Sequence, residues 1–474
     1  MPKITNNTAL YTIGNIIPQA AGFILLPLYT KYLSPKDYGI VNSLQVLASI
    51  LIILFTFAIE RSIYRLYFDY KNERDKRNFL GTIVISVTIN SLIILLLSFI
   101  LKDYLVQIYK TISFYPYFSL TILGTFFSIF SIVPKIYYQV NEQASKFVFV
   151  SFLQLLFYTI FVLWYVVFKQ ESAAGMLKGI LLGNLVLLPY FLFDSIKIIN
   201  LKFDFSALRT SLTYSLPMIP SLISAWVLNL SDRIFIERYV SVADVGIYSL
   251  GYKIAGTVLV ITSAMDKAYN PLFFRLANSG NKLENKSKII KYHHLYIYIA
   301  AFTIFLIVLF SKDLIYLLLN QRYYDSHLIV PIIGFSYLFQ MMIGLVNLSM
   351  YQEKKTNVMM VIMLSSSAFN IIANFILVPT LGIYGAAYAT LLTMIFTFLI
   401  EYYIAKNYYY IPFQWGKIIP FISSLILISI MFVYVLTFDI WLSLLIKIII
   451  VAIIAITFYK FFYMDFKVKL RNLL

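Results

Sequence analysis

The sequence predicts an all-α polytopic membrane protein with about fourteen transmembrane helices. Its 474 residues are 61% hydrophobic and only 12% charged. The apolar residues recur in blocks of about 18–25, the length that crosses a bilayer core of about 30 Å. Because no water reaches that core to satisfy the backbone, each block must form a helix. Cysteine is absent, so disulfides and thiolate metal sites are excluded.

The predicted spans follow one another along the chain with short loops between them. We expect them to begin near residues 8, 40, 79, 117, 147, 175, 213, 246, 292, 328, 357, 383, 418 and 441. So little sequence is left between the spans that we expect no separate soluble domain.

The formal net charge is +17, and the basic residues lie mainly in the loops. In a soluble protein this charge would indicate nucleic acid, whereas in loops between spans it indicates topology. Loops on one side carry about three Lys or Arg for each one on the other, which predicts that this side is cytoplasmic. Both termini then lie in the cytoplasm, which requires an even number of spans. We expect no nucleic-acid partner.

Two segments of the chain resemble each other. Lys31–Asn42 reads KYLSPKDYGIVN, and Arg238–Ser249 reads RYVSVADVGIYS. Each segment links the first and second spans of a six-span set, and two such sets share one orientation because six is even. This pattern is typical of a parallel repeat. We predict a six-helix lobe over 1–210, a second over 211–410, and two additional helices with a basic cytoplasmic tail over 411–474.

Motifs for common catalytic chemistry are absent. The sequence has no G-x-x-x-x-G-K-[ST] phosphate loop, no H-E-x-x-H zinc motif and no G-x-S-x-G nucleophile elbow. We therefore expect no ATP hydrolysis, no catalytic residues and no metal site. A membrane-embedded enzyme that uses isolated carboxylates stays an alternative, although nothing in the sequence favours it.

Polar side chains inside the spans are the best candidates for a cavity lining. An ionisable residue in hydrocarbon costs at least about 2.5–3.5 kcal/mol, so such residues usually face the protein interior or water. Lys253 is the sharpest case, because about seven residues from Gly246 place it about 10 Å into the membrane. Lys447, in the last span, is expected to snorkel. The candidate lining residues are Asn15, Gln19, Glu60, Arg61, Arg65, Asp232, Arg233 and Lys253.

Each candidate also has a structural alternative. Arg61 and Arg65 suit anchors at the membrane interface, and Asp232 with Arg233 suits a structural ion pair. Lys253 could reach the interface by snorkelling. The two amides of the first span could form interhelical hydrogen bonds.

Four stretches give the chain a resemblance to a known family. They are Lys31–Gly39 (KYLSPKDYG), Arg61–Arg77 (RSIYRLYFDYKNERDKR), Ser231–Ile254 (SDRIFIERYVSVADVGIYSLGYKI) and Val378–Thr390 (VPTLGIYGAAYAT). Together with the span pattern, they make the chain similar to polysaccharide flippases of the O-antigen and capsule type. These flippases belong to the multidrug/oligosaccharidyl-lipid/polysaccharide exporter superfamily.

The resemblance implies two six-helix lobes around a central cavity that opens alternately to the cytoplasm and the periplasm. It implies substrates that are undecaprenyl-diphosphate-linked oligosaccharides, moved from the inner to the outer leaflet of the bacterial cytoplasmic membrane for capsule or lipopolysaccharide synthesis. Transport would not use ATP, with H⁺ and Na⁺ as open alternatives for coupling, and would serve a polysaccharide polymerase or ligase. Lys253, Arg61 and Arg233 would supply cations for the diphosphate. Four tyrosines could stack on sugars, with packing as the alternative: Tyr11, Tyr64, Tyr248 and Tyr252.

Two departures from related families argue against the alternative functions. Lipid II flippases typically line their cavity with several arginines, some on the first helix, whereas the first span here carries no charge. Drug exporters of the superfamily usually place an acidic residue on that helix, and this residue is also absent. The two last predicted spans, which lipid II flippases also have, keep a lipid II flippase as one alternative. The other alternative is a cation-coupled exporter of small molecules.

Overall fold

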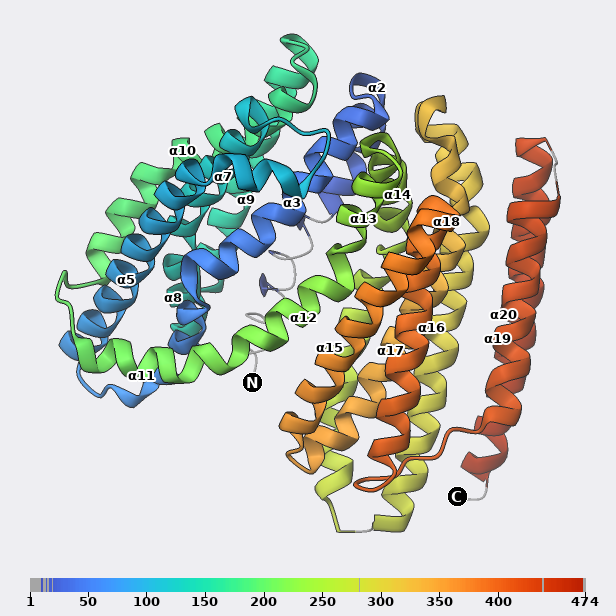
Figure 1. Ribbon diagram of the computed structural model, residues 1–474. Coiled ribbons are helices and arrows are strands. Elements are labelled where there is room, and N and C mark those ends of the chain that lie inside the picture. Colours follow the sequence, from blue (N-terminus) through green and yellow to red (C-terminus); the bar gives the residue numbers. More distant parts are fainter. Residues whose placement is uncertain are drawn as a thin grey trace. The chain divides into compact units, whose positions relative to one another are not determined.

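The chain folds into helices that form two compact units (Figure 1). The computed structural model describes residues 10–11, 14, 17–18, 20–280, 282–436 and 439–471, and for 282 and 458–471 it describes the backbone alone. Regular secondary structure within these described residues is entirely helical, which confirms the predicted all-α class.

The first unit contains residues 1–250 and 354–404. In it, α10 packs against α7 and α9, and α3 packs against α5 and α7. Its helices are α2 (Leu26–Tyr32), α3 (Pro35–Thr56), α4 (Ile63–Leu66), α5 (Glu73–Ile100), α6 (Lys102–Leu105), α7 (Ser119–Ser128), α8 (Ile132–Val140), α9 (Ala144–Leu163), α10 (Ser172–Ile198), α11 (Phe205–Ser215), α12 (Ile219–Leu230), α13 (Asp232–Tyr239), α14 (Val242–Ala255) and α18 (Thr356–Ala405).

The second unit contains residues 251–353 and 405–474, and the chain enters it within α14. Its central helix is α16, which packs against α15, α17, α19 and α20. The lobes predicted over 1–210 and 211–410 rest on the sequence repeat, and their boundaries stay a prediction. The helices of this unit are α15 (Val258–Asn278), α16 (Lys282–Leu318), α17 (Val330–Gln352), α19 (Trp415–Ile430) and α20 (Ile440–Arg471).

Twelve helical stretches of the described residues are long and apolar enough to cross a membrane. They correspond to the predicted spans from the second onward, and α18 covers two of these. Its 50 residues measure about 75 Å at 1.5 Å per residue, whereas a bilayer core is about 30 Å thick. Because the first predicted span begins outside the described residues, the count of fourteen is not confirmed.

Glycine breaks the long helix α18 into its two halves. Gly382 has φ 59° and ψ −136°, a backbone conformation outside the helical range. A Cβ on Gly385, one turn later, would overlap the carbonyl oxygen of Leu377. Both glycines lie in the VPTLGIYGAAYAT stretch, so this stretch contains the bend between the two apolar segments of α18.

Replacing Gly382 with alanine should destabilise this bend. A side chain strains the backbone at such a φ and ψ by about 1–3 kcal/mol. We expect a lower thermal unfolding midpoint for Gly382→Ala in detergent, measured by size-exclusion chromatography after heating. Gly416→Ala is the control, because a Cβ there meets no atom within 4 Å. Equal midpoints for the two variants would contradict the assignment.

The two repeated segments contact each other inside the first unit. A Cβ on Gly39 in α3 would overlap the carbonyl oxygen of Val242 in α14, and a Cβ on Gly246 would overlap that of Pro35. The relation is reciprocal, because each glycine faces the first turn of the other helix. The sequence repeat therefore has a structural counterpart in which two matching helix starts pack backbone against backbone.

The starts of α3 and α14 are also capped in the same way. Ser34 Oγ accepts a hydrogen bond from the Asp37 backbone N–H at 3.2 Å and donates one to its carboxylate at 2.5 Å. Ser241 Oγ likewise accepts from the Asp244 N–H at 3.1 Å and donates to its carboxylate at 2.6 Å. These capping pairs explain why Ser and Asp recur in both repeats.

A buried ion pair joins two helices of the second unit. Lys447 in α20 lies 2.5 Å from the Asp313 carboxylate in α16, and Ser443 donates to the same carboxylate at 3.1 Å. Lys447 is fully buried, so the prediction that it snorkels is wrong. The carboxylate supplied by α16 removes the reason for the ammonium group to reach the interface.

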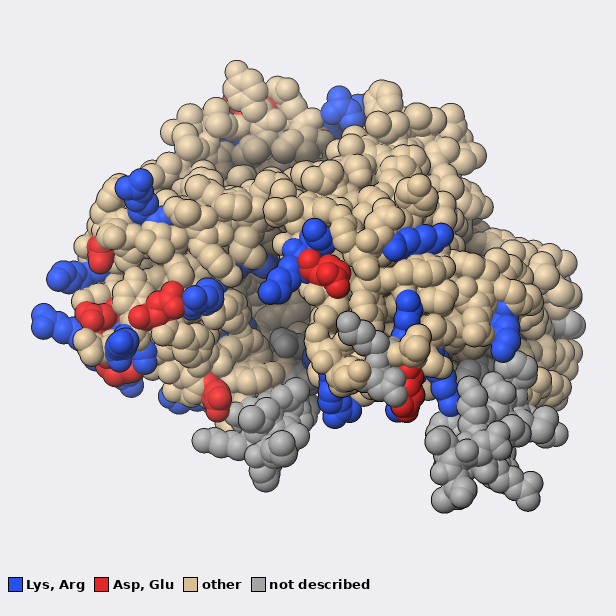
Figure 2. Space-filling model, turned by 90° about the horizontal axis from the view of Figure 1, so that it is seen from below, with Lys and Arg blue, Asp and Glu red and all other residues tan. Residues whose placement is uncertain are grey.

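Charged side chains are visible on the surface that Figure 2 shows. Lys and Arg side chains lie there with Asp and Glu side chains among them. Which loops face the cytoplasm stays a prediction.

Candidate functional site

A cavity of about 640 Å³ opens in the first unit. Its volume lies within the range of about 300–1,000 Å³ that is usual for small-molecule sites. Its walls come from α3, the segment after α3, α8, α9 and α11. The polar residues that define its chemistry are Glu60, Arg61, Tyr64, Lys135, Gln139 and Tyr214.

A turn at the end of α3 places three of these residues at the cavity. Phe57 and Ala58 have φ values of 45° and 55°, and the Thr56 hydroxyl accepts a hydrogen bond from the Ala58 N–H at 3.1 Å. The helix therefore ends at Thr56 instead of continuing through Glu60 and Arg61, which lie in a short 3₁₀ turn. This turn redirects both charged side chains toward α8.

Lys135 is a cation of this cavity that the sequence interpretation counted among the loop charges. It lies in α8, five residues before the helix ends at Val140, which is about 7–8 Å along the helix axis. Its side chain is half-buried and donates a hydrogen bond to Gln154 of α9. Because the apolar segment continues unbroken past Pro134, the sequence does contain a signal that Lys135 lies within a span.

The cavity therefore combines two cations with one carboxyl group. Arg61 is exposed to the cavity, and the Tyr64 hydroxyl donates to the side-chain oxygen of Gln139. Glu60 has one buried carboxyl oxygen for which the described residues provide no hydrogen-bond partner. Burial raises the pKa of Glu60 above its ordinary value, and the neighbouring Arg61 charge lowers it in part.

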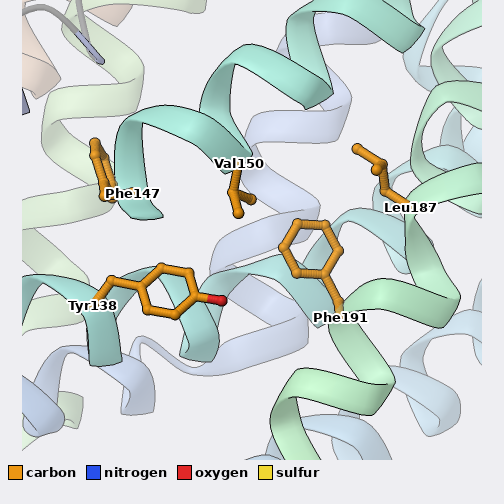
Figure 3. Packing of buried hydrophobic residues seen from close by; sticks show 5 residues of the cluster. All are labelled: Tyr138, Phe147, Val150, Leu187 and Phe191. Atoms are coloured by element: carbon orange, nitrogen blue, oxygen red, sulfur yellow. The ribbon is translucent and has the colours of Figure 1, made fainter. Parts of the chain in front are cut away.

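A cluster of buried hydrophobic side chains packs between α8, α9 and α10 (Figure 3). Tyr138 of α8, Phe147 and Val150 of α9, and Leu187 and Phe191 of α10 are each at most 6% exposed. Phe147 lines the 640 Å³ cavity, so the rigid core of the unit is also part of the site. A packed wall of this kind holds the α8 and α9 side chains in fixed positions.

Arg65 points elsewhere. Its guanidinium lies 2.5 Å from the Asp69 carboxylate, and both side chains are at least half exposed. Arg65 is not among the residues that line the 640 Å³ cavity. A cavity role for Arg65 stays a prediction.

Asp232 and Arg233 form a buried network in the first unit. One Asp232 oxygen accepts from Arg233 Nη1 at 2.7 Å, and the other accepts from the Tyr248 hydroxyl. Arg233 also donates to the Asn229 carbonyl at 2.7 Å. Asp232 is 3% exposed and Arg233 is 6% exposed. This geometry matches the structural ion pair that the sequence left open, and a lining role stays a prediction.

The remaining candidates lie in different parts of the chain. Lys253 belongs to the second unit and is half-buried near the end of α14. Neighbouring Tyr252 makes an edge contact with the Tyr337 ring at 5.9 Å between centroids. Asn15 and Gln19 lie outside the described residues. Their proposed roles are therefore unchanged.

Glu237 is a buried, hydrogen-bonded carboxylate that was not among the candidates from the sequence. It is 2% exposed and accepts hydrogen bonds from the Lys110 N–H, the Thr111 N–H and the Thr111 hydroxyl at 2.7–3.0 Å. It thus fixes the segment after α6 to α13. Since these partners lie about 126 positions away, no local pattern reveals the contact.

Comparison with known families identifies the kind of protein. Residues 4–277, more than half of the chain, match the model of a family described as polysaccharide biosynthesis protein. The chain belongs to this family. Residues 217–376 of this polysaccharide biosynthesis protein also match the MatE model. The resemblance to polysaccharide flippases of the multidrug/oligosaccharidyl-lipid/polysaccharide exporter superfamily is therefore confirmed.

Curated relatives of this family member come from Haemophilus influenzae. Protein 1 of the Lsg locus is 27% identical over 281 residues, which are 57% of this chain and 66% of that protein. A second membrane protein is 24% identical over 285 residues, covering 59% of this chain and 67% of its own length. The chain thus matches about two thirds of the length of each relative.

Solved structures show the same fold. A lipid II flippase, MurJ, in an inward closed conformation has a TM-score of 0.74 at 15% identity, covering 95% of this chain and 99% of that one. An inward-facing multidrug resistance MATE transporter has a TM-score of 0.60 at 14% identity, covering 84% and 98%. The family member is thus a multi-pass membrane protein, with the family and fold of a transporter rather than of a catalytic enzyme.

Proposed function

We propose that this protein moves undecaprenyl-diphosphate-linked oligosaccharides from the inner to the outer leaflet of the bacterial cytoplasmic membrane. The observation that carries this proposal is the cavity of the first unit, where Arg61 and Lys135 line one space inside a membrane-spanning bundle. Membership of the polysaccharide biosynthesis family supports the substrate class. Both termini lie in the cytoplasm in this proposal, and a polymerase or ligase acts on the product.

The chemistry of the head group explains why such a cavity is required. A diphosphate with attached sugars cannot cross hydrocarbon unaided, because its charges and hydroxyl groups would lose their water without replacement. A guanidinium and an ammonium offer charge-assisted hydrogen bonds to phosphate oxygens. Alternating access then carries the head group across, while the polyprenyl chain stays in the lipid.

Complementation of a flippase-null strain tests the proposal. Wild-type protein should restore surface polysaccharide and prevent lipid-linked repeat units from accumulating inside the cell. Arg61→Gln and Lys135→Met should each restore less than wild type, because losing a hydrogen bond to a charged group costs about 1.5–3 kcal/mol, or about 10- to 100-fold in affinity. The readout is the amount of lipid-linked repeat unit, normalised to membrane protein level.

The control for this test is Lys36→Gln, which removes an exposed cation from the first turn of α3. It should complement like wild type. Full activity of the Arg61→Gln, Lys135→Met double variant would contradict the proposed binding site. The fold likeness to MurJ favours lipid II as a second candidate substrate. Rescue of cells depleted of their lipid II flippase, without rescue of the polysaccharide strain, would select that alternative.

Binding of the anionic head group should weaken as pH rises through the pKa of Glu60. Burial raises this pKa, so the carboxyl group keeps its proton to a higher pH than a free glutamate at about 4.3. Once it ionises, a negative charge joins the cavity and repels the diphosphate. The affinity for a short-chain polyprenyl diphosphate can be measured by calorimetry at a series of pH values. In Glu60→Gln, the fall in affinity that accompanies ionisation of Glu60 should be absent. An unchanged pH profile in that variant would exclude Glu60.

A further inference from the structure

A second cavity, of about 430 Å³, adjoins the first. Lys135 and Phe147 line both cavities, so these two side chains stand where the spaces meet. The second cavity is lined by residues of α8, α9 and α10 and by Gly14 and Pro18, and it shares Phe147 with the hydrophobic cluster of Figure 3. Close approach of α10 to α9 at Gly183, where a Cβ would lie 3.0 Å from the Tyr158 Cα, forms its far wall.

The polar groups of this second cavity are amides and a hydroxyl, together with the Lys135 ammonium. Gln154 Oε1 accepts from Lys135, which directs the amide NH₂ of Gln154 away from the lysine. Asn184 donates to the Gly124 carbonyl at 3.1 Å, which leaves its oxygen as an acceptor. Ser151 adds a hydroxyl, and none of the described lining residues is acidic.

We propose that this second cavity is a saccharide subsite, which takes the sugar next to the diphosphate while Lys135 contacts a phosphate oxygen. The inference rests on the proposed function for the identity of the whole ligand. A pyranose offers hydroxyl groups that both donate and accept, which matches one amide donor, one amide acceptor and one hydroxyl. It also has an apolar face, which matches the rings of Phe147 and Tyr158.

Two other occupants fit this chemistry less well. A polyprenyl chain would strip water from Lys135, Gln154 and Asn184 without replacing its hydrogen bonds, which is unfavourable. An organic cation would meet the ammonium group of Lys135 with no acidic residue in the described lining to balance it. The arrangement therefore favours a neutral, hydroxyl-rich group attached to an anion.

Binding measurements with two matched probes test the subsite. The probes are a short-chain polyprenyl diphosphate that carries N-acetylglucosamine and the same diphosphate without a sugar. Asn184→Leu should weaken binding of the sugar-bearing probe by about 10-fold and leave the sugar-free probe unchanged, because Asn184 is hydrogen-bonded to the Gly124 carbonyl and not to Lys135. Arg61→Gln should weaken both probes equally. Equal losses for both probes in the amide variant would overturn the subsite.

A second measurement is independent of the diphosphate and of transport. Because the chain has no cysteine, Ser151→Cys creates a unique thiol inside the second cavity. Methyl N-acetylglucosaminide should slow its modification by a small maleimide, whereas decanol and tetraphenylphosphonium should not. Protection by decanol or by the cation, without protection by the glycoside, would overturn the proposal.

These two measurements separate the subsite from the proposed function. Protection by the glycoside with no binding of either diphosphate probe would leave the subsite in place and remove the lipid-linked substrate. Size-exclusion profiles and thermal unfolding of Asn184→Leu and of Ser151→Cys, compared with wild type, show whether each protein is folded before its binding is scored.

Discussion

Replacing Gly39 with alanine should prevent the first unit from packing correctly. The added Cβ would overlap the carbonyl oxygen of Val242, which is backbone and cannot rotate away. The two helix starts would have to separate, and overpacking typically costs about 1–3 kcal/mol, with the upper end expected where backbone meets backbone. We expect little folded Gly39→Ala protein in membranes, measured by fluorescence-detected size-exclusion chromatography. Gly246→Ala should behave in the same way, because its Cβ would overlap the Pro35 carbonyl.

Gly344→Ala is the matched control for both substitutions. Gly344 lies within helix α17, and a Cβ there meets no atom within 4 Å. Alanine favours a helix over glycine by about 0.5–1 kcal/mol, so this variant should be as stable as wild type or slightly more stable. If Gly39→Ala behaved like Gly344→Ala, the close contact between α3 and α14 would not exist in the membrane.

Removing one partner of the Asp313–Lys447 pair should destabilise the second unit by about 3–5 kcal/mol. Both side chains are at most 5% exposed, and their charged atoms lie 2.5 Å apart. Asp313→Asn leaves a buried ammonium group without a counter-charge, and Lys447→Met leaves a buried carboxylate. Each change should lower the thermal unfolding midpoint and weaken the attachment of α20 to α16.

The double variant Asp313→Asn, Lys447→Met distinguishes pairing from packing. Without either charge the cost of burial disappears, so the double variant should be more stable than both single variants. Thermal unfolding in the same detergent measures all three. Additive losses in the double variant would show that the two side chains contribute independently. Lys288→Gln is the control, because its pair with Glu284 is about half exposed and contributes little.

The sequence predicted most of the helical architecture, because span length and hydropathy are local properties of the chain. The prediction was less complete where one residue changes the backbone path. Gly382 lies between two apolar segments that the sequence predicts as separate spans, and nothing local in the sequence shows that its positive φ leaves only a bend between the two halves of α18. The end of α3 at Thr56 is a similar case, since Phe57 is apolar and gives no sign that a turn begins there.

The candidate site was also predictable only in part, because local sequence features are visible in the chain and contacts between helices are not. Glu60 and Arg61 were candidates because charged residues stand out near the end of an apolar segment, and both line one cavity together with Tyr64. Their part in transport stays a prediction. Lys135 was counted as a loop charge although the sequence around it stays apolar past Pro134. Its partner Gln154 lies on another helix, so no local pattern shows the contact. The sequence left two alternatives for Asp232 and Arg233, a structural ion pair and a cavity lining. The hydrogen bond from Tyr248 to Asp232 bears on this choice, but it joins separate helices and is not visible in the sequence.

The backbone contact between the two repeats has a consequence for how their sequences can diverge. Gly39 fits only while residue 242 keeps its carbonyl in place, and Gly246 fits only while residue 35 does the same. The Cα–H groups of the two glycines face carbonyl oxygens, where such contacts contribute about 0.5–1 kcal/mol each. Because each repeated segment packs against the other, a substitution at either glycine disturbs both segments. Gly39 and Gly246 are therefore constrained together, although 207 positions separate them.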